Sequence, residues 1–182
     1  MELELFLQKV IADKYLHACW LNSLSYLEYR GFRKIVRSQS TEEITKEILL
    51  HVNEEVKHAL ILKKLAIKIG GINFSHYSEK TMLSGQNLKK YFYNLDLEIS
   101  KHASSNLYQA VTLTIELRAL KIYRAYETLL QASQEGITIQ VIIDDEEKHL
   151  DQFLNFLPTD EEDKFRRIEE KCFNELWECI VL

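Results

Sequence analysis

The scarcity of glycine and proline is the feature that most restricts how this chain can fold. Its 182 residues include only 5 Gly and 1 Pro. A β-sandwich or a doubly wound α/β fold of this length needs many tight turns, and most turn types use one of these two residues. Hydrophobic residues make up 46% of the chain and charged residues 28%, which argues against disorder. The composition therefore predicts a few long helices.

The spacing of apolar residues and the capping patterns divide the chain into helical segments. A helical period runs through residues 3–38, and Ser40-Thr41-Glu42-Glu43 reads as a capping box that opens a second helix. That helix is expected to end near residue 69, before Gly70 and Gly71. A loop is expected over 72–83, followed by a helix at 84–101 and another from Ser104 or Ser105 to 133. A further helix is expected at 138–156, between Gly136 and Pro158. A second capping box, Thr159-Asp160-Glu161-Glu162, opens a last helix that runs to 179.

The four main helices form two pairs. A short connection within each pair makes its two helices antiparallel neighbours. The stretch 70–104 joins the pairs and is long enough to cross a bundle. The sequence thus predicts an all-α fold: a four-helix bundle with a long crossover between its helix pairs and an extra C-terminal helix, in a single domain over residues 1–182.

Two Glu-x-x-His motifs stand at corresponding places in the two pairs. Residues three apart share a face of a helix, so each carboxylate converges with its imidazole. Both motifs lie on the apolar stripe of their helix, and one glutamate lies on the apolar stripe of each preceding helix. The resulting set is Glu28, Glu55, His58, Glu116, Glu146 and His149.

Four carboxylates in one core repel each other unless they protonate or bind cations. Two divalent metal ions would balance their charge. A polar core of salt bridges would need buried cations instead, and the same apolar stripes supply none. The set therefore predicts a site for a pair of metal ions.

This ligand set resembles that of the ferritin-like di-iron carboxylate superfamily, in which two helices each give a Glu and two each give Glu-x-x-His. The resemblance covers residues 10–156 and rests on the ligand motifs. It implies a ferritin-like bundle that holds two metal ions, iron in first place with manganese as the alternative. By the resemblance, Glu55 and Glu146 bridge the metals, and Glu28 and Glu116 bind one metal each.

Two differences between this chain and rubrerythrins bear on which branch of the superfamily it resembles. Rubrerythrins carry an extra acid one turn after the third-helix Glu, and this chain has Ala119 there. The chain also lacks a rubredoxin-type Cys pair, which argues against a peroxidase role. The function expected is thus a di-iron oxygenase or oxidase that uses O₂, an external electron donor and a small organic substrate. The alternatives are iron handling, as a ferroxidase or peroxide scavenger, and a metal-free helical interaction module.

Further residues are candidates for supporting the site. Asp145 and Glu54 each precede a bridging Glu, and in several di-iron oxygenases an acid at that position hydrogen-bonds a ligand His; a solvated helix edge is the alternative. The small residues Gly31, Ala59 and Ala119 follow three ligands by one turn, so they could leave room for O₂ or substrate, and close helix packing explains them equally well. The other histidines lack a partner pattern and are not expected to be ligands: His17, His51, His76 and His102.

The net charge of −5 gives no basic field for nucleic acid or an anionic membrane surface. No apolar run reaches about 18 residues, so no membrane span is expected. The N-terminus does not read as a signal peptide, and a cytoplasmic location is expected. The sequence leaves a homodimer open.

Overall fold

The computed structural model describes residues 2–39, 41–102, 107–133, 136–153 and 159–180. These residues form helices joined by turns, without a strand among them. The all-helical class predicted from the sequence is confirmed, and it is compatible with a ferritin-like fold. The chain divides into two compact units: unit 1 comprises residues 1–7 and 86–182, and unit 2 comprises residues 8–85. The single domain expected from the sequence stays a prediction.

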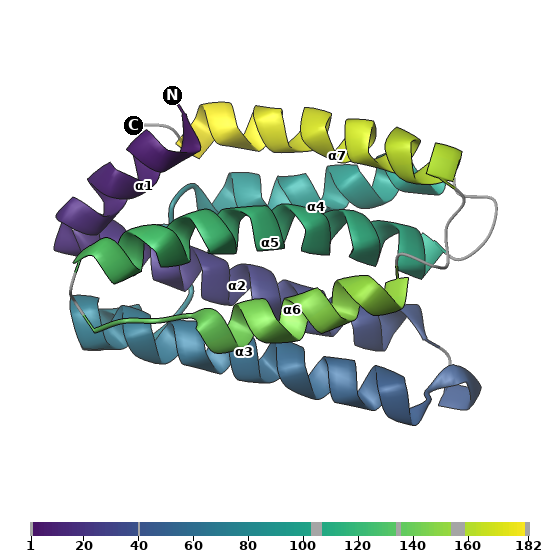
Figure 1. The fold of residues 1–182 in the computed structure, drawn as a ribbon, viewed down its shortest axis with the longest axis horizontal. Coiled ribbons are helices and arrows are strands. Elements are labelled where there is room, and N and C mark those ends of the chain that lie inside the picture. The colour runs from purple at the N-terminus through teal and green to yellow at the C-terminus, as the bar shows by residue number, and fades with distance from the viewer. Residues whose placement is uncertain (1, 40, 103–106, 134–135, 154–158, 181–182) are drawn as a thin grey trace. The chain divides into compact units, whose positions relative to one another are not determined.

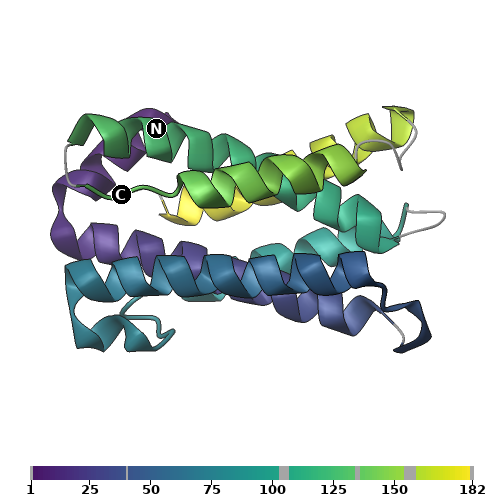
Figure 2. The same ribbon diagram turned by 60° about the horizontal axis from the view of Figure 1, so that its bottom comes forward.

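Unit 2 is built on two long antiparallel helices, α2 (Lys14–Ser38) and α3 (Lys46–Gly70), which pack along their length (Figure 2). The helical period expected over 3–38 is broken at Asp13, between α1 (Leu3–Ala12) and α2. The Asp13 carboxylate accepts hydrogen bonds from the backbone N–H groups of Tyr15 and Leu16, at 2.8 and 3.0 Å. This side chain therefore starts a new helix where the apolar pattern alone continues.

The start of α3 differs from the prediction. Residues Thr41–Glu43 form a 3₁₀ turn, and Thr45 caps the helix by accepting a hydrogen bond from the Ile48 N–H at 3.3 Å. The predicted capping box therefore does not open this helix, and Ser40 lies outside the described residues. The predicted end is confirmed: Gly71 has a φ of +84° and its N–H donates to the Ile67 carbonyl at 2.8 Å.

The loop after α3 is fastened to the α2–α3 pair by polar groups. It contains the 3₁₀ turn η2 (Ile72–Ser75). The Asn22 side-chain amide donates to the Thr81 carbonyl at 2.8 Å, and the Lys63 ammonium donates to Asn22 Oδ1. The same ammonium lies 3.4 Å from the centre of the Tyr77 ring. Residues 72–83 form the loop that the sequence predicts.

Unit 1 contains most of α4 (Gly85–Ser100), together with α5 (Leu107–Ser133), α6 (Gln140–Phe153) and α7 (Thr159–Ile180). Both α6 and α7 pack against α5 (Figure 1). These helices match the expected segments, although α6 begins two residues later than predicted. Gly136 precedes it with a φ of +64°. Ser104, Ser105 and Pro158 lie outside the described residues, as do the side chains of Thr159 and Asp160.

Two buried glutamates hold the helices of unit 1 in place. Glu127 of α5 accepts hydrogen bonds from Thr138 Oγ1 at 2.8 Å and from the Ile139 N–H at 2.7 Å, which fixes the start of α6. Glu169 of α7 accepts from the Tyr91 hydroxyl of α4 at 2.8 Å and from the Arg118 guanidinium of α5, at 2.7 Å for the shortest contact. The second glutamate therefore joins three helices through one ion pair and one hydrogen bond.

In the part of the chain that the structure describes, every helix is too short or too polar to cross a bilayer.

Candidate metal centre

Unit 2 carries a buried cluster of two carboxylates and two imidazoles. Glu28 comes from α2, and His51, Glu55 and His58 come from α3. All four are at most 6% exposed. His58 Nδ1 lies 3.6 Å from Glu28 Oε2, and His51 Nε2 lies 3.4 Å from Glu55 Oε1. The positions 51, 55 and 58 share one face of a helix, which is why a single helix supplies three of these groups.

The donor distances in this cluster suit a metal ion. One ligand atom from each of Glu28, Glu55 and His58 lies within 4.8 Å of the other two. Two donors that are each about 2.1 Å from one ion can be at most about 4.2 Å apart. The pair formed by His58 Nδ1 and Glu28 Oε2, at 3.6 Å, already meets this limit. The unit 2 cluster could thus hold a divalent ion with small side-chain movements.

Gly31 has a specific steric role beside this cluster. A Cβ atom added at Gly31 would lie 2.5 Å from Glu55 Oε2. The absence of a side chain therefore leaves room for the Glu55 carboxylate itself. The sequence predicts space for O₂ or substrate around Gly31, Ala59 and Ala119. Ala59 is buried and Ala119 is half-buried, and this pocket stays a prediction.

Unit 1 carries a second buried cluster, formed by Glu116 of α5 with Glu146 and His149 of α6. Each is at most 4% exposed. His149 Nδ1 lies 3.3 Å from Glu146 Oε2 and 4.0 Å from Glu116 Oε1. The packing of α6 on α5 thus brings together three predicted ligands that are up to 33 residues apart in the sequence.

All six predicted ligands lie in these two clusters, three in each unit. The structure therefore shows buried carboxylate–histidine clusters that could bind metal ions. The union of the two clusters in one centre, the number of ions and the identity of the metal stay predictions.

The His51 ring, which is not expected from the sequence to be a ligand, contacts Glu55 and belongs to a group that could hold a metal ion. The expectation that His51 is not a ligand stays a prediction. A signal was present in the sequence: His51 precedes Glu55 by four residues, so the motif is His-x-x-x-Glu-x-x-His. The comparison of the two helix pairs gives no counterpart for it, because Ile142, which is fully buried, stands four residues before Glu146.

Asp145 and Glu54 are the two acids that the sequence predicts to support the ligands. Asp145 is 6% exposed and accepts a hydrogen bond from the Lys148 ammonium at 3.0 Å. Glu54 is half-buried on α3. Their predicted hydrogen bonds to ligand histidines stay predictions.

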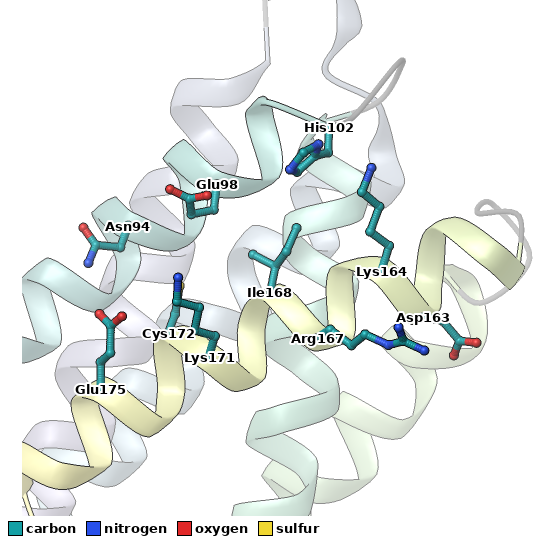
Figure 3. Close-up of a pocket in the computed structure, with 10 residues that line it drawn as sticks. All are labelled: Asn94, Glu98, His102, Asp163, Lys164, Arg167, Ile168, Lys171, Cys172 and Glu175. Carbon is teal, nitrogen blue, oxygen red and sulfur yellow. The ribbon is translucent and has the colours of Figure 1, made fainter.

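A separate cavity of about 690 Å³ opens in unit 1 between α4 and α7 (Figure 3). Charged side chains dominate its lining, among them Glu98, Lys164, Arg167 and Lys171. None of the predicted site residues lines it. Its walls are those of a solvated groove, unlike the buried clusters.

Comparison of the chain with models of protein families, with curated proteins and with solved structures finds no match. The buried clusters and the sequence pattern are therefore the features that bear on function.

Proposed function

We propose that this chain is a non-haem di-iron oxidoreductase, which uses O₂ to oxidise or hydroxylate a small organic substrate. The observation that carries the proposal is the presence of a buried cluster of carboxylates and imidazole in each of the two units. Burying ionised carboxylates is costly unless cations accompany them. The resemblance of the ligand motifs to the ferritin-like superfamily supports the same conclusion.

In this proposal the two clusters act together. Glu28, Glu55 and His58 from unit 2, and Glu116, Glu146 and His149 from unit 1, would hold two metal ions. Four carboxylates carry four negative charges, which two divalent ions neutralise. Oxygen and imidazole donors suit iron and manganese. When bound, such a pair supplies two-electron redox chemistry toward O₂.

The residues of the chain have positioning roles. Glu55 is placed to be a shared ligand, because it lies beside His51 and also within reach of Glu28 and His58. Gly31 keeps the space that the Glu55 carboxylate occupies. Burial of the ligands excludes bulk water from the donors, which strengthens their electrostatic interaction with a cation. Electrons come from an external donor in this proposal.

The test measures metal content and O₂ consumption of the purified chain. We expect two iron or manganese ions per chain, and O₂ uptake that depends on an added organic substrate and a reductant. Replacing Glu55 by Gln should abolish both. Rapid oxidation of Fe(II) with mineral formation and no organic substrate would instead support the iron-handling alternative. A protein that binds no metal would overturn the proposal and support an interaction module.

A further inference from the structure

The unit 2 cluster has an internal asymmetry that centres on Glu55. Glu28 and His58 form a compact group of three donors with it. His51 forms a separate pair with it, at 3.4 Å from Oε1. We propose that unit 2 holds the first of two metal ions by itself, at Glu28, Glu55 and His58, and that His51 with Glu55 begins the second position. This inference rests on the proposed function in so far as both require metal binding.

Unit 2 alone supplies the ligands and the negative charge that the first ion needs. It offers two carboxylates and one imidazole, all at most 6% exposed. The two carboxylates balance the charge of one divalent ion. Its donors come from α2 and α3, which pack along their length, so binding requires no rearrangement of helices. Three protein ligands suffice for a metal site, with water in the remaining positions.

The second position is incomplete within unit 2. His51 and Glu55 are two donors, and Glu55 is shared with the first position. Two protein ligands are fewer than the three or four that a transition-metal site ordinarily uses. We therefore expect the second ion to need further donors beyond those of unit 2, and to bind more weakly. The two helix pairs also differ chemically. Ile142 of α6 stands four residues before Glu146, whereas His51 of α3 stands four residues before Glu55.

The experiment titrates the metal-free full chain with Mn(II), under argon, and follows binding by calorimetry and by the electron paramagnetic resonance of free Mn(II). The wild type should bind two ions in two steps whose affinities differ at least tenfold. His51→Gln should keep the first step and lose the second. His149→Ala should do the same. His58→Ala should weaken the first step at least tenfold.

The matched control is His17→Gln, which removes another buried imidazole of unit 2, 1% exposed, and should leave both steps unchanged. Circular dichroism checks that each variant is folded, and His149→Gln replaces His149→Ala if the latter is not. Two unchanged steps in His51→Gln, or loss of both ions in the folded His149 variant, would overturn the inference while leaving the proposed function in place. A wild type that binds no metal would overturn the proposed function as well.

Discussion

Replacing Gly31 by alanine is a perturbation whose effect can be worked out from the structure. The added Cβ would lie 2.5 Å from Glu55 Oε2, whereas real Cβ contacts are essentially never shorter than 3.0 Å. The carboxylate therefore has to withdraw by about 0.5 Å or more. The colliding atom is the end of a flexible side chain, so the helices need not move.

Two opposite effects on free energy follow. Alanine is more favourable than glycine inside a helix by about 1 kcal/mol, which corresponds to a gain of roughly 2–4 °C in Tm for a chain of this size. Metal binding should weaken, because a ligand carboxylate has moved from its place; disturbing the support of a metal ligand typically costs about 10–100-fold in affinity. Gly31→Ala should thus be at least as stable as the wild type without metal, and bind metal at least about tenfold more weakly.

Thermal unfolding of the metal-free protein and Mn(II) titration measure the two effects separately. A double-mutant cycle with Glu55→Asp supplies the control, because aspartate is shorter by one methylene, roughly 1.5 Å, and clears the added methyl group. In the Glu55→Asp background, Gly31→Ala should therefore cost no further metal affinity. Wild-type metal affinity in the single Gly31→Ala variant would refute the steric reasoning.

Three further predictions concern the stability of the fold. Removing metal with a chelator should lower the Tm at pH 7, because an ion that binds only the native state stabilises it; thermal scans with and without chelator check this, and equal midpoints would count against metal binding. Arg118→Met should cost about 3–5 kcal/mol in urea unfolding, since it leaves the Glu169 carboxylate buried without its cation. Tyr91→Phe removes only a hydrogen bond to that carboxylate and should cost less, about 1.5–3 kcal/mol. An equal or larger loss in Tyr91→Phe would contradict the ion-pair reasoning. Burial, and secondarily the charge of Arg30, lowers the pKa of Lys34 from 10.5 to about 7. Between these pH values the unfolded chain binds more protons than the folded chain does. The free energy of unfolding should therefore rise with pH in this range. Lys34→Met should reduce that rise in urea titrations at pH 7 and 9.5, and an unchanged slope would show that Lys34 is solvated.

Much of the helical organisation could be predicted because its signals are local. Gly71 ends α3 where the pattern places the stop, since its backbone adopts a positive φ that glycine tolerates. The start of α3 could not be chosen locally, because the hydroxyls of Ser40 and Thr45 are both suitable caps. The break at Asp13 was hidden in the same way by an apolar period that continues on both sides of it.

The ligands could be predicted because charged groups on an apolar stripe are expensive and need a partner. The correspondence between the two helix pairs points to Glu55 and His58, which have counterparts in the other pair. It does not point to His51, which has none. The steric role of Gly31 depends on the conformation of a side chain on another helix, so it could not be seen in the sequence.

Glu127 lets α5 fix the start of α6. Its carboxylate anchors the first turn of α6 at Thr138 and Ile139, about 10 Å along that helix from Glu146 and about 16 Å along α5 from Glu116. A residue outside the cluster thus sets the rotation of α6 about its axis. That rotation determines the direction in which the Glu146 and His149 side chains point. Random mutagenesis scored by metal content should therefore yield hits at Glu127, where a folded chain would present the correct ligands in the wrong orientation.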